Sequence, residues 1–166
     1  MKTRSLTTLA LLTALSLLLF TVENFLPPPV PIPGVKLGLA NVVTVWALYH
    51  VSASHAALVL FARVMIAAFF SGAASALLFS LTGGLLGLCG ALCVRHRAPV
   101  WMASAVGGAL HNLGQLAAAI FITRSTALRS YLPFLLLAGL ICGSVTGMIA
   151  QLVSARLDKA PVRFRK

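Results

Sequence analysis

Long apolar runs, interrupted by short polar breaks, fill the sequence up to about residue 157. The first run, residues 6–26, has the roughly 20 apolar residues that a helix needs to cross the hydrocarbon core of a bilayer. The breaks hold Pro, Gly, Ser and basic residues, which are typical of turns at a membrane surface. The pattern predicts an all-α integral membrane protein with six transmembrane helices. Their expected bounds are 5–26, 37–51, 55–70, 74–94, 99–123 and 131–155.

The composition supports a membrane environment. The 166 residues are 60% hydrophobic and only 9% charged, whereas soluble domains have about 25% charged residues. A secretory signal peptide is the alternative for the first run, but that run exceeds the roughly 7–15 residues of a signal core, so we expect a retained helix. The organisation predicted is one six-helix domain over residues 1–157 and a short basic tail over residues 158–166.

Basic residues dominate the charge, with 13 Lys and Arg against two acids and a net charge of +11. They lie at the chain ends and in the breaks, so we expect them to contact anionic lipid headgroups and not nucleic acid. Their distribution predicts an N-in/C-in topology, because most of them then face the cytoplasm. The cytoplasmic set would be Lys2, Arg4, Arg95, Arg97, Arg156, Lys159, Arg163, Arg165 and Lys166, and the outer set Lys36, Arg124 and Arg129.

Small residues recur every four positions on three of the expected helices. They are Ala10 and Ala14 on the first, Gly83 and Gly87 on the fourth, and Gly139, Gly143 and Gly147 on the sixth. This spacing lets membrane helices approach closely. We expect packing within this chain first, and docking of a partner subunit on the first or sixth helix is the alternative.

Few ionisable residues lie at membrane depth. Glu23 is near the outer end of the first helix, and residues 27–34, PPPVPIPG, predict a rigid outer loop because five prolines exclude a helix. This loop leads to Lys36 at the start of the second helix, with Asn41 further along that helix. Arg63 lies in the middle of the third helix, in LFARVMIAAFF, with no acid nearby in sequence.

Charges in a bilayer need a partner or a wet cavity, because a charged side chain at its centre costs at least about 2.5 kcal/mol. We expect Glu23 to pair with either Arg63 or Lys36, which leaves one basic group to receive an anionic ligand. A purely structural ion pair, or an arginine that extends to the headgroups, is the alternative interpretation. The short second and third helices are where we expect a binding site.

The fifth helix carries a cluster of polar side chains in HNLGQ. His111 and Gln115 are four residues apart and share a face, with Asn112 next to them. Hydrogen bonding between helices explains such a cluster, and so does the lining of a ligand cavity. The three cysteines lie in apolar stretches, where packing is a better explanation than a disulfide or a metal site.

The segments PIPGVKLGLANVVT, LFSLTGGLLG, GGALHNLGQLAAA and YLPFLLLAGLICGSVTG together resemble the bacterial membrane family of heptaprenyl diphosphate synthase component I, also called the Gx transporter family. This family is in turn similar to the substrate-binding S-components of energy-coupling-factor (ECF) transporters. The resemblance implies a bacterial cytoplasmic (inner) membrane protein with an S-component-like bundle. The residues it implies for substrate binding are Lys36, Leu37, Asn41, Arg63, His111, Asn112 and Gln115, to which the charge argument adds Glu23.

The same resemblance implies the partners. Ala10 and Ala14 would face an ECF coupling membrane subunit, and ATPases would supply the energy, since the chain has no P-loop. The function expected first is therefore a membrane-embedded substrate-binding subunit for uptake of a small molecule. The alternative is a non-catalytic accessory subunit of heptaprenyl diphosphate synthase in isoprenoid or menaquinone metabolism, with a soluble prenyl synthase as partner.

Catalysis by this chain is not expected. Prenyl synthases hold Mg²⁺ and a diphosphate with clustered aspartates, because hard cations need several oxygen ligands. The chain has one aspartate, Asp158. No hydrolase motif is visible either, so we expect no catalytic residue, no metal and no cofactor. A basic group beside amides favours an anionic or amphipathic ligand, whose identity the sequence leaves open.

Overall fold

The computed structural model describes residues 3–27, 36–72 and 74–158. Within these ranges the chain forms helices and no strand. Most of the proline-rich segment predicted as a rigid loop, and the basic tail beyond Asp158, lie outside the described residues. The elements are α1 (Thr3–Phe25), α2 (Leu39–His50), α3 (Ala53–Ser71), α4 (Ala74–Val94), α5 (Val100–Thr123), the 3₁₀ helix η1 (Thr126–Tyr131) and α6 (Leu132–Leu157).

Five of the six predicted helices are long and apolar enough to cross a membrane. The exception is α2, whose 12 residues extend only about 18 Å at 1.5 Å per residue, against a hydrocarbon core of about 30 Å. The all-α membrane class is confirmed, whereas the predicted count of six transmembrane helices is supported for five, because α2 is too short. The N-in/C-in topology stays a prediction.

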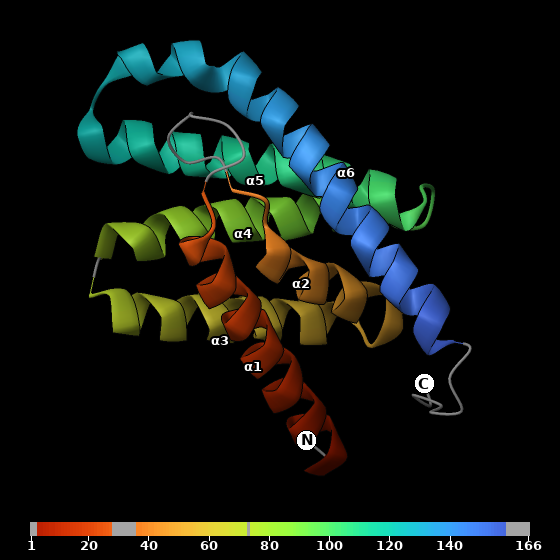
Figure 1. Cartoon of the computed structure of the whole chain (residues 1–166). Coiled ribbons are helices and arrows are strands. Elements are labelled where there is room, and N and C mark those ends of the chain that lie inside the picture. Colours follow the sequence, from red (N-terminus) through yellow and green to blue (C-terminus); the bar gives the residue numbers. More distant parts are fainter. Residues whose placement is uncertain (1–2, 28–35, 73, 159–166) are drawn as a thin grey trace.

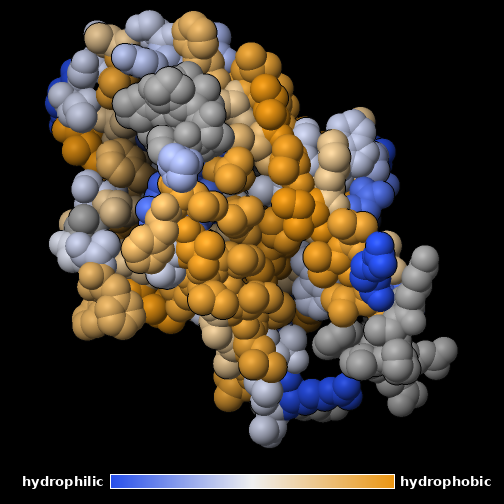
Figure 2. Space-filling view, in the orientation of Figure 1, coloured by the Kyte–Doolittle hydropathy of each residue, from blue (hydrophilic) through white to orange (hydrophobic). Residues whose placement is uncertain are grey.

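Apolar side chains cover much of the face of the molecule that Figure 2 shows. Large side chains such as Phe69 and Phe70, near the C-terminal end of α3, are 83% and 82% exposed. Exposed apolar surface of this extent is unfavourable in water and favourable in lipid. The chain is therefore a multi-pass membrane protein.

Glycine packing joins α4, α5 and α6 into one unit, drawn from green to blue in Figure 1. A Cβ atom on Gly87 of α4 would lie 2.8 Å from the carbonyl oxygen of Gly107 on α5, and one on Gly143 of α6 would lie 2.5 Å from that of Ser104 on α5. Backbones that approach this closely have no room for a side chain. The same close approach occurs at Gly83, Gly139 and Gly147. The glycine stripes on α4 and α6 therefore serve packing within the chain.

The alanine stripe on α1 is placed differently. Ala10 and Ala14 are both exposed, so they are not used in the packing of the described residues. The face they form remains open to lipid or to another subunit, and its use for docking stays a prediction.

Helices α2 and α3 pack against the glycine-packed unit mainly through side chains, and α1 packs on α2 and α3. Leu48 of α2, Leu60 of α3 and Leu88 of α4 belong to one buried hydrophobic cluster. Between the two groups of helices lies a cavity, and the leucine cluster forms its inner end.

Candidate functional site

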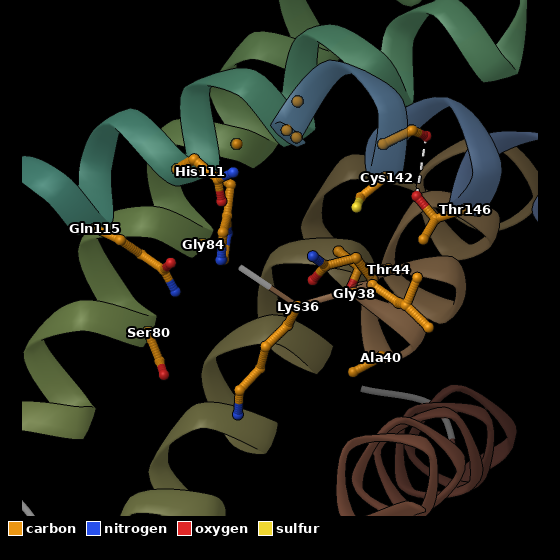
Figure 3. Close-up of a pocket in the computed structure, with 18 of the residues that line it drawn as sticks. Lys36, Gly38, Ala40, Thr44, Ser80, Gly84, His111, Gln115, Cys142 and Thr146 are labelled. Atoms are coloured by element: carbon orange, nitrogen blue, oxygen red, sulfur yellow. Dashed lines mark hydrogen bonds between the residues drawn. The ribbon is translucent and has the colours of Figure 1, made fainter. Parts of the chain in front are cut away.

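The cavity has a volume of about 620 Å³ and is lined by every helix of the fold. This is within the roughly 300–1,000 Å³ of sites that bind small molecules. In Figure 3, His111 and Gln115 of α5 and Ser80 of α4 line one side, and Thr44 of α2 with Cys142 and Thr146 of α6 line the other. All of the residues predicted for substrate binding line this one cavity, namely Glu23, Lys36, Leu37, Asn41, Arg63, His111, Asn112 and Gln115. That they bind a substrate remains a prediction.

Glu23 caps the N-terminus of α2. Its carboxylate accepts hydrogen bonds from the backbone N–H groups of Gly38, at 2.6 Å, and Leu39, at 2.9 Å. Gly38 has a φ of 81°, a left-handed conformation that favours glycine, and this turns the chain so that both N–H groups point at Glu23. The first N–H groups of a helix have no partner within it, and the helix dipole favours a negative charge there. Glu23 therefore fixes α2 to α1.

Arg63 is a buried cation that makes few polar contacts with the surrounding protein. Its side chain is 7% exposed, and its Nη2 atom donates a long hydrogen bond of 3.3 Å to Oδ1 of Asn41. Its Nε atom is buried and has no hydrogen-bond partner among the described residues. The hydroxyl of Thr44, one turn after Asn41 on α2, is likewise buried without a partner. A guanidinium group has five N–H donors, so Arg63 has donors available for a ligand.

Lys36 lies at the outer end of the cavity and is exposed. Its ammonium group donates a hydrogen bond of 2.7 Å to Oδ1 of Asn24 and lies 5.2 Å from the centre of the Phe20 ring. A cation in this position gains a modest cation–π attraction and keeps its solvation. Lys36 therefore marks the cavity entrance.

Neither ion pair expected for Glu23 forms. Within the described part of the chain, Glu23 hydrogen-bonds the α2 backbone and makes no contact within 4 Å with the charged group of Arg63 or Lys36. The expectation of a direct pair was wrong because backbone N–H groups satisfy the carboxylate instead. With one acid and two basic groups lining the cavity, its net charge is positive.

The polar residues of α5 have different surroundings. The Asn112 side chain donates a hydrogen bond of 2.8 Å to the carbonyl oxygen of Leu135, so it joins α5 to α6. His111 and Gln115 pack against Gly83, where a Cβ atom would lie 3.2 Å from Cε1 of His111 and 2.8 Å from Cγ of Gln115. The Gln115 amide has no hydrogen bond to another described residue. Asn112 thus has a structural role, while His111 and Gln115 face the cavity.

The inner end of the cavity is apolar and closed. Leu48, Leu60 and Leu88 are 3%, 2% and 8% exposed. Ser104 and Thr146 also line this end, but their hydroxyl groups hydrogen-bond each other at 3.1 Å, and Thr146 donates to the carbonyl of Gly143 at 3.0 Å. This end therefore offers a ligand no free polar group.

Several residues that line the cavity were not predicted from the sequence. Thr44 and Ser80 face the cavity, yet single hydroxyl groups in apolar helices are common and carry little signal. Thr44 was open to prediction, because it lies three residues after Asn41 and so on the same helix face. Aromatic residues at the entrance, Phe20 and Tyr131, are indistinguishable in sequence from lipid-facing ones.

The arrangement suits binding better than chemistry. Among the described residues, no group of three His, Cys, Asp or Glu side chains could hold a metal ion. The cavity combines a buried cation, amide and hydroxyl groups, and apolar walls. This combination is chemically complementary to an anionic group attached to an apolar body.

A comparison with protein-family models agrees with the resemblance seen in the sequence. The model described as heptaprenyl diphosphate synthase component I matches residues 12–153, which is most of the chain. The chain belongs to this family. No curated protein and no solved structure matches it significantly. The match covers every residue that lines the polar part of the cavity, so the site belongs to the portion of the chain that the component I family describes.

Proposed function

We propose that this component I protein is a non-catalytic membrane subunit that binds a prenyl diphosphate and acts together with a separate prenyl synthase. The observation that carries the proposal is the buried Arg63 side chain, which faces an apolar cavity with its Nε atom unpartnered. Burial of a cation without a directly paired acid is unfavourable by several kcal/mol, and Glu23 attracts Arg63 without a direct contact. An anionic ligand therefore stabilises Arg63. The family description supports a prenyl diphosphate as that ligand.

The chemistry of a prenyl diphosphate fits both parts of the cavity. Its diphosphate accepts charge-assisted hydrogen bonds of the kind that arginine makes best. Its isoprenoid tail is apolar, as are the leucine side chains at the inner end of the cavity. The synthesis itself needs several acidic ligands for Mg²⁺, and this chain has two acids in total. A partner subunit therefore performs the reaction.

Binding of a prenyl diphosphate to the purified protein tests the proposal. We expect the Arg63→Ala substitution to weaken binding at least about 30-fold, because truncating one partner of a buried charge pair costs 2–5 kcal/mol. Arg129→Ala is the matched control, since Arg129 is exposed and does not line the cavity. Thermal unfolding of each variant shows whether it is folded. Normal binding by a folded Arg63→Ala variant would refute the site.

Association with a synthase tests the second half of the proposal. The detergent-solubilised protein should retain a soluble, aspartate-rich prenyl synthase from the same cell during affinity purification, and added prenyl diphosphate should strengthen the association. Purification of the two proteins as separate species under both conditions would contradict the accessory role and leave the ligand site standing.

A second function, uptake of a small anionic molecule, is favoured by the side on which the cavity opens. Tyr131 and Lys36, both exposed, lie at its entrance, at the opposite end of the helices from Thr3 and Leu157. If basic residues favour the cytoplasmic side, the entrance faces outward. The exposed Ala10 and Ala14 then offer α1 to a coupling subunit. A transporter subunit needs both features.

Cysteine labelling separates the two functions. In a background without the three native cysteines, we would introduce Lys36→Cys at the entrance and Arg97→Cys at the opposite end of the molecule. A membrane-impermeant maleimide added to intact cells should label Lys36→Cys alone if the cavity serves uptake. Labelling of Arg97→Cys alone would place the entrance in the cytoplasm and exclude uptake from outside.

A further inference from the structure

The cavity continues only a short way past Arg63. We propose that the closed leucine cluster limits the ligand to a short isoprenoid tail, so that the site binds a short-chain allylic diphosphate and excludes the long product of chain elongation. This inference rests on the proposed function, because it assumes a prenyl diphosphate whose charged group lies near Arg63. In this proposal Leu48, Leu60 and Leu88 determine how long an isoprenoid tail the site accepts.

The register of the helices gives the depth of the apolar end. On α3, Leu60 is three residues before Arg63, and on α2, Leu48 is seven residues after Asn41. At 1.5 Å per residue these separations correspond to about 4.5 and 10.5 Å along the helix axes. The apolar space beyond the polar side chains is therefore about 5–10 Å deep.

The end of this space is closed by packed protein. Leu48, Leu60 and Leu88 form one hydrophobic cluster with Ala47, Ala56 and Ala91. The three leucines line the cavity, whereas the three alanines do not. The alanines are 0%, 0% and 4% exposed. Cores packed in this way resist the insertion of extra methylene groups. A tail that reaches the cluster thus has no continuation.

Exposure rises in the opposite direction. Leu60 is 2% exposed, whereas Tyr131 at the entrance is 47% exposed. A ligand therefore enters past Lys36 and Tyr131, and its apolar tail leads. The unpartnered groups of Arg63 and Thr44 then lie above the tail, where they meet the diphosphate.

The depth corresponds to few isoprene units. One unit adds four bonds along the chain and extends by about 5 Å, by comparison with the roughly 3.5 Å spanned by the three bonds of an amino-acid residue. One or two units fill the space. A longer tail must either displace the leucine cluster or hold its diphosphate away from Arg63.

Binding measured across a series of prenyl diphosphates with one, two, three and four isoprene units tests this inference. Affinity should rise from one unit to two, because each buried methylene group strengthens binding about fourfold. It should fall at least tenfold at three or four units. The readout is the dissociation constant by calorimetry for the whole protein in nanodiscs.

The Leu60→Ala variant identifies the residue that sets the limit. Removing this side chain lengthens the apolar space, so the optimum should move to a longer tail. Val64→Ala is the matched control, because Val64 belongs to the same cluster on the same helix, is 2% exposed and does not line the cavity. It should leave the optimum unchanged.

The outcomes distinguish this inference from the function on which it rests. If affinity is equal or still rising at four units, and Arg63→Ala abolishes it, the length limit is wrong and the prenyl diphosphate site stands. If no member of the series binds in a manner that depends on Arg63, the proposed function is wrong. If Val64→Ala moves the optimum as far as Leu60→Ala does, the leucine does not set the limit.

Discussion

Replacement of Glu23 tests whether this residue is a helix cap or a ligand group. Its carboxylate accepts two hydrogen bonds from α2, at 2.6 and 2.9 Å, and it is 7% exposed. Hydrogen bonds to a charged group contribute about 1.5–3 kcal/mol each. The Glu23→Gln variant keeps one acceptor oxygen and loses the charge, so it should destabilise the start of α2 by about 1–2 kcal/mol. Glu23→Ala loses both bonds and should cost about 2–4 kcal/mol.

Hydrogen exchange of the Gly38 and Leu39 amides measures this loss locally. One to two kcal/mol corresponds to a factor of about 5–30, so exchange at the two amides should accelerate by about that factor in Glu23→Gln and further in Glu23→Ala. Asn24→Ala is the control, because Asn24 accepts its hydrogen bond from Lys36 at the surface. In Asn24→Ala the Gly38 and Leu39 amides should exchange as fast as in the unaltered protein.

The result that refutes the cap is unchanged exchange together with lost ligand binding in Glu23→Gln. That outcome would mean that the carboxylate contacts the ligand and that α2 is held by other groups. Accelerated exchange with a parallel, modest loss of binding supports the cap, because α2 carries Asn41 and Thr44 into the cavity.

Three further substitutions follow from the same contacts. Asn112→Leu removes the hydrogen bond to the Leu135 carbonyl and should destabilise the protein by about 1 kcal/mol, measured by thermal unfolding in detergent; no change would mean that water replaces the amide. Gly143→Leu places a side chain against the Ser104 carbonyl oxygen, 2.5 Å from the ideal Cβ position, and should lower the free energy of unfolding by more than about 3 kcal/mol. A smaller loss would mean that α5 and α6 can separate without loss of packing. Lys36→Ala should leave the unfolding temperature nearly unchanged, since exposed contacts contribute little, and should slow ligand association in stopped-flow measurements; unchanged association would show that Lys36 is not at the entrance.

Polar residues in apolar helices were the most informative feature of the sequence. A charged or amide side chain in a membrane helix avoids lipid, so Arg63, Asn41 and the HNLGQ cluster were all expected to face the interior. The structure brings them to one cavity for that reason. This reasoning does not fix which group each side chain contacts. Asn112, for example, binds a backbone carbonyl of α6.

The error over Glu23 has a specific physical origin. A search for its partner in sequence considers only side chains, whereas its partners are two backbone N–H groups, which every residue except proline provides. Only the left-handed turn at Gly38 brings them to the carboxylate. The same turn delays the start of α2 to Leu39, two residues after the predicted start, and Ser52, whose hydroxyl accepts from the His55 N–H, already begins α3. These two local signals explain why α2 is too short to span the membrane.

The position of the closed end bears on both proposed functions. Among the described residues, Arg4, Arg95, Arg97 and Arg156 lie at the end of the helices opposite the cavity entrance. If that end is cytoplasmic, a ligand that enters past Lys36 reaches the cytoplasm, or a cytoplasmic synthase, only through the leucine cluster.

The packing indicates which part of the fold must then move. Helices α4, α5 and α6 are in backbone contact through their glycines, as at Gly87 and Gly107, whereas α3 meets α4 where the flexible end of Leu60 covers Gly84. Helices in backbone contact cannot shift without losing that contact, whereas a leucine side chain can change rotamer and let a helix move. Opening of the closed end therefore requires displacement of α1, α2 and α3 from a fixed unit of α4, α5 and α6. Glu23 ties α2 to α1, and the hydrogen bond between Asn41 and Arg63 ties α2 to α3, so we expect such a displacement to involve the three helices together.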